Sequence, residues 1–326
     1  MTPAPGDEGG PEPLEQIPPA PAREIVVLAG GTGGAKLARG VAQAYGPERL
    51  TVIANTGDDI EIYGAHVSPD PDLVSFWLAD SIDERGWGLR DDTFAVMDAL
   101  RALGVEVWFN LGDRDLAWCI ERARLIAEGL TPTAALARLN EAGRLRESVL
   151  PMTDAPVRTW VQTDAAGWRS FQEYMIRGRA SGRVEGVEYH GAEDAAPSAE
   201  VLEAIAAATV ILIGPSNPIA SIGPILAVPG LRAALRDAAA PVVGVSPIVA
   251  GEVIKGPTAA FMEHAGQPLT AAGVAAVYGA DLLDGMVADE QLDGIASVQT
   301  ETLMADALSR AALARAAVEF AESLTG

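Results

Sequence analysis

Two apolar runs near the start of the chain, each ending in a polar loop, restrict the folds that this sequence can adopt. The first run covers residues 25–29 and leads into Gly30-Gly31-Thr32-Gly33-Gly34-Ala35-Lys36; the second covers residues 50–54 and leads into Asn55-Thr56-Gly57-Asp58-Asp59. With the helical stretch between them they form a βαβ unit, whose strands are parallel. Parallel strands bring both loops to one edge of a sheet, so backbone donors for a phosphate and carboxylates for a metal should face one crevice. This arrangement is typical of a nucleotide site.

The alternation of apolar runs and helical periodicity continues along most of the chain. Strands are predicted at residues 25–29, 51–54, 105–109, 210–214, 241–246, 285–288 and 295–299, and helices at 36–45, 71–80, 91–103, 198–207, 223–237, 258–265, 271–278 and 303–324. Apolar strands that alternate with helices predict an α/β fold with a doubly wound, mainly parallel, Rossmann-like sheet.

The domain organisation follows from where this alternation starts and where it is interrupted. Residues 1–22 contain seven prolines and three glycines without apolar periodicity, which predicts a disordered tail. A helix-rich stretch at 116–140 and short strands at 157–163, 168–175 and 184–189 break the alternation later. We therefore expect one catalytic domain over residues 23–326, with a cap subdomain inserted at about residues 115–195.

Composition narrows the class of protein. The 326 residues are 49% hydrophobic and carry a net charge of −22, which disfavours nucleic acid as a partner. No apolar run reaches the length of a membrane span and no signal peptide is recognisable, so we expect a cytoplasmic protein that does not bind membranes. Cys119 is the only cysteine, and we interpret it as a buried, inert thiol.

Four aspartates around the second strand indicate a metal site. Asp58 and Asp59 are adjacent, and Asp70 and Asp72 follow shortly after. A solvated loop, or a helix cap near Pro71, would explain one or two of these acids, but an acidic chain that binds a polyanion also needs a cation. We expect Mg²⁺ as the cofactor, held mainly by Asp58 and Asp72, with Asp59 or Asp70 as supporting or alternative ligands.

Further polar loops follow the other predicted strands. Leu111-Gly112-Asp113-Arg114-Asp115 comes after residues 105–109, although a helix-start ion pair would also explain it; Ser216, Asn217 and Ser221 come after residues 210–214. With Asn55 and Lys36, these side chains would bind a nucleotide whose phosphates lie on the amides of residues 30–34. The glycine loop lacks the P-loop spacing and the acidic residue of dinucleotide-binding folds. Trp87 lies between two glycines, where it can stack on a flat ring.

Taken together, these segments resemble the 2-phospho-L-lactate transferase family of coenzyme F-420 biosynthesis. The matching motifs are the glycine loop, Asn55-Thr56-Gly57-Asp58-Asp59, Ser68-Pro69-Asp70-Pro71-Asp72, Gly86-Trp87-Gly88, Leu111-Gly112-Asp113-Arg114-Asp115, Pro151-Met152-Thr153-Asp154, Phe171-Gln172-Glu173-Tyr174, Gly214-Pro215-Ser216-Asn217-Pro218 and Ser246-Pro247-Ile248. Pro71 stands where the family commonly has leucine.

The resemblance implies transfer of a phospholactyl or phosphoenolpyruvyl group from a guanosine diphosphate-linked donor to the ribityl hydroxyl of 7,8-didemethyl-8-hydroxy-5-deazariboflavin, releasing GMP. It further implies deazaflavin contacts at Asp72 and Asn110, and a homodimer. Asp58 and Asp72 would then carry the chemistry, because attack on a diphosphate depends on charge neutralisation and positioning.

Two other functions fit parts of the sequence. A non-enzymatic, nucleotide-sugar-binding regulator of the gluconeogenesis-factor type shares the glycine loop and the sheet, but is not expected to carry the motifs at residues 151–154 and 171–174. A dinucleotide-dependent oxidoreductase lacks support because no ribose-binding acid and no proton-transfer residue can be identified. The residues do not distinguish phospholactyl, phosphoenolpyruvyl and phosphoglyceryl donors.

Overall fold

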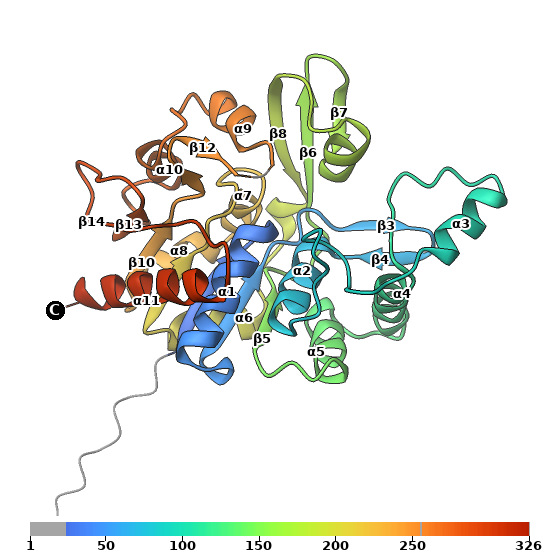
Figure 1. The fold of residues 1–326 in the computed structure, drawn as a ribbon, viewed down its shortest axis with the longest axis horizontal. Helices are drawn as coiled ribbons and strands as arrows, with labels where there is room; N and C mark the ends of the chain where they lie inside the picture. Colours follow the sequence, from blue (N-terminus) through green and yellow to red (C-terminus); the bar gives the residue numbers. More distant parts are fainter. Residues whose placement is uncertain (1–23, 255, 326) are drawn as a thin grey trace, which may run out of the picture.

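The centre of the molecule is a seven-stranded parallel sheet (Figure 1). The structure is a computed structural model that describes residues 24–254 and 256–325, so the predicted tail at residues 1–22 lies outside the described part. The strand order is β14-β13-β10-β9-β1-β2-β5, and every neighbouring pair is parallel. The strands are β1 Ile25–Ala29, β2 Leu50–Ala54, β5 Ser148–Pro151, β9 Val210–Ile213, β10 Val242–Val245, β13 Gly285–Ala288 and β14 Ser297–Gln299.

Helices cover both faces of this sheet, which confirms the predicted doubly wound α/β fold. Val27 of β1 packs into a core with α1, α2, α5 and α11, while its neighbours Val26 and Leu28 pack into a core with α6, α7, α8, α9 and α10. Successive side chains of a strand point to opposite faces, so a strand buried on both sides must be apolar throughout. The helices are α1 Gly31–Tyr45, α2 Pro69–Leu78, α5 Pro132–Ala142, α6 Ala199–Ala207, α7 Ile222–Ala227, α8 Leu231–Arg236, α9 Thr258–His264, α10 Ala271–Tyr278 and α11 Ala307–Ser323.

Two insertions, separated by a strand of the central sheet, rise beside its carboxyl edge. The first contains the hairpin of β3 Ile60–Ile62 and β4 Ala65–Val67 and the helices α3 Ala95–Ala102 and α4 Asp113–Ala127. The second contains β6 Arg158–Thr163, β7 Gly167–Ser170 and β8 Val184–His190, which form a small antiparallel sheet with a π-helix, Glu173–Arg177, between β7 and β8. Since β5 lies between them, residues 115–195 do not form one continuous inserted unit.

The strand predicted at residues 105–109 is absent. The chain after α3 is irregular there, and Phe109 packs with Leu111, Leu116 and the hairpin residue Val67 in a separate small core. The apolar character of residues 105–109 therefore reflects burial in this local core and not a place in the central sheet. Residues 111–115 accordingly lead directly into α4 instead of following a sheet strand.

Smaller differences have local causes. The helix predicted at residues 223–237 is two helices, α7 and α8, because Pro229 and Gly230 interrupt it and Gly230 has a φ of +93°. The strand predicted at 168–175 ends at Ser170, where the π-helix segment begins shortly after. A short antiparallel pair, β11 Ile248–Val249 and β12 Glu252–Val253, follows β10. Among the described helices, none has both the length and the apolar character needed to cross a membrane.

Candidate active site

A pocket of about 540 Å³ opens at the carboxyl edge of the central sheet. Loops after four parallel strands line it: residues 30–33 after β1, Asp58 after β2, residues 215–217 after β9 and Ser246 after β10. The predicted site residues that line it are Gly30, Gly31, Thr32, Gly33, Lys36, Asp58, Asp70, Asp72, Trp87, Asn110, Ser216, Asn217 and Ser221. Gly34, Asn55 and Asp59 do not line it. The parallel sheet thus brings together segments that are far apart in the sequence, as the βαβ pattern predicted.

The glycine loop begins helix α1 and presents part of its first turn to the pocket. Gly30 N–H donates to Ser216 Oγ at 3.3 Å, and Gly31 N–H donates to Asp70 Oδ1 at 2.7 Å. Gly31 has a φ of +66°, which favours glycine. The N–H of Gly31 is therefore engaged by a side chain of the protein. This corrects the expectation that the amides of residues 30–34 are all open to a phosphate.

Gly33 and Gly34 are glycines for a packing reason. A Cβ on Gly33 would lie 1.9 Å from the carbonyl oxygen of Pro215, and a Cβ on Gly34 would lie 2.8 Å from Cα of Ala29. The loop after β9 therefore presses against α1 at these positions. A side chain at position 33 would therefore first meet backbone atoms of Pro215.

Asp58 and Asp70 form a pair of buried carboxylates at the base of the pocket. The Nδ2 of Asn55 donates to both of them, at 3.2 Å to Asp58 Oδ1 and 2.9 Å to Asp70 Oδ2. Burial, followed by the charge of Asp70, raises the pKa of Asp58 well above its usual value, and burial also raises the pKa of Asp70. Asn55 holds the two acids together from below, so a side chain that does not line the pocket still shapes the site.

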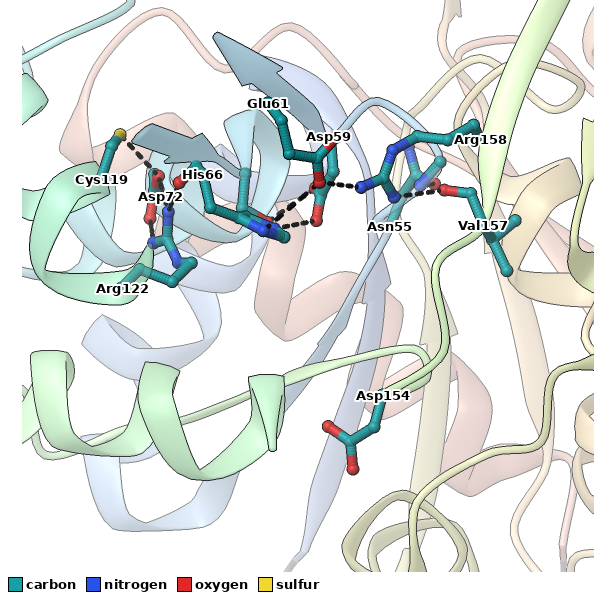
Figure 2. A network of polar contacts seen from close by, with 12 residues as sticks. Asn55, Asp59, Glu61, His66, Asp72, Cys119, Arg122, Asp154, Val157 and Arg158 are labelled. Atoms are coloured by element: carbon teal, nitrogen blue, oxygen red, sulfur yellow. Dashed lines mark hydrogen bonds and ion pairs between the residues drawn. The ribbon is translucent and has the colours of Figure 1, made fainter. Parts of the chain in front are cut away.

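Asp59 points away from the pocket, although it is adjacent to Asp58. It accepts a hydrogen bond from His66 Nε2 at 3.1 Å (Figure 2). It also accepts one from Ser68 Oγ at 2.7 Å. The next acid, Glu61, contacts Arg158 at 2.6 Å on the same side. Asp59 therefore ties the hairpin β3–β4 to the loop after β2, and its place favours a supporting role.

Asp72 is engaged by an arginine that the sequence analysis did not identify. Arg122 donates from Nη1 to Asp72 Oδ2 at 3.0 Å and from Nη2 to Oδ1 (Figure 2). Trp118 Nε1 donates to Asp72 Oδ1 at 2.9 Å. Burial raises the pKa of Asp72, and Arg122 opposes this rise. Arg122 also donates to the carbonyl oxygen of His66 at 3.0 Å. Asp72 is thus a fixed, charge-compensated carboxylate in the pocket wall.

One face of α4 supplies this group of residues. Three side chains of this group lie three, four and seven residues after Asp115: Trp118, Cys119 and Arg122. This spacing places all four residues on one side of the helix. That spacing was the signal that could have revealed Arg122. Burial, followed by the charges of Asp72 and Asp92, raises the pKa of Asp115 to about 7.

Cys119 is buried among these acids. Its Sγ lies 4.0 Å from Asp72 Oδ2 and 3.9 Å from Asp115 Oδ1, and burial raises the pKa of the thiol well above its usual value. This confirms the interpretation of a buried thiol with little thiolate character. Asp72, Asp115 and Cys119 are close enough to bind a metal, but Arg122 already compensates Asp72.

The loop after β9 supplies polar groups opposite the acids. Ser216 is buried and accepts from Gly30, while Asn217 Oδ1 accepts from the N–H groups of Ile219 and Ala220, both at 2.9 Å. The Nδ2 of Asn217 is buried and has no hydrogen-bond partner within the described residues. Asn217 lines the pocket, and its side chain therefore carries an unused hydrogen-bond donor there.

The far end of the pocket is apolar and belongs to the insertions. Its lining includes Phe76, Trp87, Phe109, Leu111, Phe171, Met175 and Ile176. The Trp87 side chain is 41% exposed, and the guanidinium of Arg85 lies 4.4 Å from its ring centre. Asn110 Oδ1 accepts from Arg101 at 2.8 Å, and Lys36 Nζ donates to the carbonyl oxygen of Met304 at 3.1 Å. The pocket therefore joins a polar half that suits phosphates to an apolar half that suits a flat ring.

Comparisons with known proteins show the family of the chain. The model of the 2-phospho-L-lactate transferase CofD family matches residues 25–320. A phosphoenolpyruvate transferase of Streptomyces coelicolor is 44% identical over 314 residues, which cover 92% of this chain and 98% of that protein. A 2-phospho-L-lactate transferase of Methanosarcina mazei is 40% identical over 268 residues, covering 82% of this chain and 87% of that protein.

A solved structure shares the fold at low identity. A UPF0052 family protein of Bacillus halodurans superimposes with a TM-score of 0.60 and 17% identity, covering 91% of this chain and 99% of that one. This likeness concerns the fold alone. The family match and the identities of the curated relatives carry the functional conclusion: the chain belongs to the 2-phospho-L-lactate transferase CofD family and is a transferase of coenzyme F-420 biosynthesis.

Proposed function

We propose that this enzyme joins a guanosine diphosphate-linked three-carbon donor to the ribityl hydroxyl of 7,8-didemethyl-8-hydroxy-5-deazariboflavin. The hydroxyl oxygen bonds to the phosphorus that carries the three-carbon group, the bond from that phosphorus to GMP breaks, and the hydroxyl proton is lost. The observation that carries the proposal is that a single pocket joins the glycine loop and buried acids to an apolar wall.

The guanosine diphosphate part is proposed to lie between the glycine loop and the loop after β9. The first turn of α1 favours negative charge, as helix N-termini do, although the N–H groups of Gly30 and Gly31 are already engaged by Ser216 and Asp70. Ser216 and Asn217 face this turn, and the unused Nδ2 of Asn217 is a donor for the nucleotide. The small residues on this side leave backbone groups, not side chains, to contact the phosphates.

Mg²⁺ is the proposed cofactor, and the acids beneath the glycine loop fit it. Asp58 and Asp70 are buried side by side, and each raises the cost of ionising the other unless a cation lies between them. Hard oxygen ligands of this kind suit Mg²⁺, which would neutralise charge on the transferred phosphoryl group. The earlier pairing of Asp58 with Asp72 stays a prediction; the salt bridge of Asp72 to Arg122 favours Asp70 as the partner of Asp58.

The deazaflavin ring is proposed to lie against Trp87, Phe109 and the apolar residues of the π-helix. Its ribityl chain would then reach Asp72 and Asn110, which both line the pocket. Arg122 holds both oxygens of Asp72, so the carboxylate is best suited to accept a hydrogen bond from the hydroxyl and orient it. A cytoplasmic location and a homodimer remain predictions from the sequence.

The phosphoenolpyruvyl group is the proposed donor group. The relatives that match nearly the whole chain, from Streptomyces coelicolor and Thermobifida fusca, carry the name phosphoenolpyruvate transferase, whereas the match to the 2-phospho-L-lactate transferase of Methanosarcina mazei is shorter. The test is to incubate the purified protein with deazariboflavin, Mg²⁺ and equal amounts of the guanylylated phosphoenolpyruvyl, phospholactyl and phosphoglyceryl donors. Mass spectrometry should show mainly the enolpyruvyl product, and GMP in equal amount. Absence of any phosphodiester product would contradict the transferase reaction itself.

The metal site has a matched pair of variants. Asp58→Asn should lower kcat by at least a hundredfold at saturating substrates, while Asp59→Asn, one residue away but outside the pocket, should cost much less. An excess of chelator should stop turnover in the wild type, and added Mg²⁺ should restore it. Turnover that persists in chelator would exclude the proposed metal role.

A further inference from the structure

A second pocket, of about 360 Å³, lies in the small sheet of the second insertion. Its lining residues come from β6, the turn before β7, β7 itself, the π-helix and the turn that follows it. The small sheet of this insertion stands apart from the central sheet (Figure 1). Its ten lining residues are Val161, Thr163, Ala165, Ala166, Arg169, Tyr174, Arg177, Gly178, Arg179 and Ser181. None of these residues belongs to the candidate active site.

The charge of this pocket is opposite to that of the protein. Three of its lining residues are arginines and none is acidic, in a chain with 45 acidic and 23 basic residues. Arg177 is compensated by Glu106 at 2.7 Å and by Glu173 at 3.6 Å. Within the described residues, the guanidinium groups of Arg169 and Arg179 have no hydrogen-bond or ion-pair partner. Two uncompensated cations therefore border one cavity.

The backbone that carries Arg179 is held in an unusual conformation. Arg179 and Ala180 have φ values of +51° and +49°, which residues other than glycine rarely adopt. Gly178 N–H donates to Glu173 O at 2.8 Å and Ala180 N–H donates to Tyr174 O at 2.9 Å, so the turn is fixed on both sides. Strained backbone of this kind is maintained where the surroundings demand it, commonly at binding sites. The backbone that carries Arg179 to the pocket is therefore held by hydrogen bonds.

We propose that this pocket binds a small phosphate ester. The planar guanidinium groups of Arg169 and Arg179 match the oxygens of a phosphate, and Thr163 and Ser181 line the same cavity. Val161 and the two alanines supply a short apolar surface for a few carbon atoms. The volume lies at the low end of the range for small-molecule sites, which favours a phosphorylated compound of a few carbons over a nucleotide.

The occupant of this pocket would contact the wall of the active site. The π-helix contributes Tyr174 and Arg177 to the second pocket, and Met175 and Ile176 to the first. One short helix therefore separates the two pockets. A ligand bound to Arg169 and Arg179 would restrain the helix that forms part of the proposed deazaflavin wall.

The test combines calorimetry with hydrogen–deuterium exchange, using glycerol 3-phosphate as the probe and glycerol as its uncharged control. The wild type is compared with Arg169→Gln/Arg179→Gln and with Arg183→Gln, a nearby arginine that pairs with Glu185 and lies outside the pocket. We expect the double variant to weaken binding at least tenfold, the Arg183 variant to leave it unchanged, and glycerol not to bind.

Exchange locates the bound molecule independently of affinity. In the wild type the probe should slow exchange across residues 171–183, and this protection should disappear in the double variant. Protection confined to residues 30–36 would mean that the ester binds only at the glycine loop, which would overturn the proposal. Equal binding by the wild type and the double variant, or no binding to either, would overturn it as well. None of these outcomes depends on the transfer reaction.

Discussion

Replacing Arg122 by methionine should destabilise the protein through the buried carboxylate that it leaves behind. Arg122 is 2% exposed and Asp72 is 4% exposed, so water does not reach either group freely. Without Arg122, Asp72 keeps the indole N–H of Trp118 and a long contact to Cys119, and the carbonyl oxygen of His66 loses its donor. Removing one partner of a buried ion pair costs about 3–5 kcal/mol.

The same structure predicts how this loss can be recovered. In the double variant Arg122→Met/Asp72→Asn both charges are absent, and replacing a whole buried pair is often nearly neutral. We expect the free energy of unfolding of the double variant to lie within about 2 kcal/mol of the wild-type value. Much of the stability that Arg122→Met loses would then be regained. Asp72→Asn alone should fall between, because its amide oxygen still accepts one hydrogen bond from Arg122.

The assay is urea unfolding of all four proteins, followed by circular dichroism at pH 5 and pH 8. The pKa of Asp72 is raised by burial and loses the opposing effect of Arg122 in the single variant, so its folded form favours the protonated acid. The stability of Arg122→Met should therefore fall further as pH rises, whereas the double variant should lack this added slope. If the losses of the two single variants simply add in the double variant, the reasoning is refuted.

Further predictions concern the pH dependence and the packing of the site. Asp115 has a pKa raised to about 7 from an ordinary value of 3.8, so the stability that its protonated form contributes is present below pH 4 and is lost as pH rises to about 7. Asp115→Asn should unfold like the wild type at pH 4 but be more stable at pH 8 by about 4 kcal/mol, measured by urea unfolding; equal stability at both values would contradict this origin of the pKa. Gly33→Val should lower the melting temperature, because its Cβ meets the carbonyl of Pro215. Gly31→Ala, with open space around its Cβ, should cost less, and the reverse order in scanning calorimetry would show that the contact with Pro215 is not limiting.

The central sheet was predictable because its strands are apolar on both faces and its loops begin where that character ends. The strands at β1, β2, β9 and β10 follow their apolar runs closely, and their polar ends meet in one pocket. The same criterion misplaced a strand at residues 105–109, since an apolar run also fits a segment buried in a small local core. Periodicity reports burial, and it does not report which core the segment joins.

The partners of the acids were harder to predict. The sequence shows that Asp58, Asp59, Asp70 and Asp72 are close along the chain, but not that they turn toward different partners. Asp59 turns to the hairpin β3–β4, and Asp72 turns to an arginine fifty residues later in α4. Long-range pairing depends on how the insertion folds back over the sheet, and a short apolar and acidic pattern contains no information about that geometry.

The position of Asp70 predicts that the proposed binding of a diphosphate depends on a cation. Gly31 N–H at the start of α1 already donates to Asp70, so a carboxylate lies where the helix N-terminus would attract a phosphate. At this short range and an effective dielectric constant of about 20, like charges repel by about 4 kcal/mol, which a bound cation must offset. The affinity for GDP, measured by calorimetry, should therefore rise at least tenfold with Mg²⁺ in the wild type. In Asp70→Asn, GDP should bind more tightly than to the wild type without Mg²⁺, and added Mg²⁺ should increase the affinity less. An identical response to Mg²⁺ in both proteins would mean that Asp70 neither repels the phosphates nor helps to hold the ion.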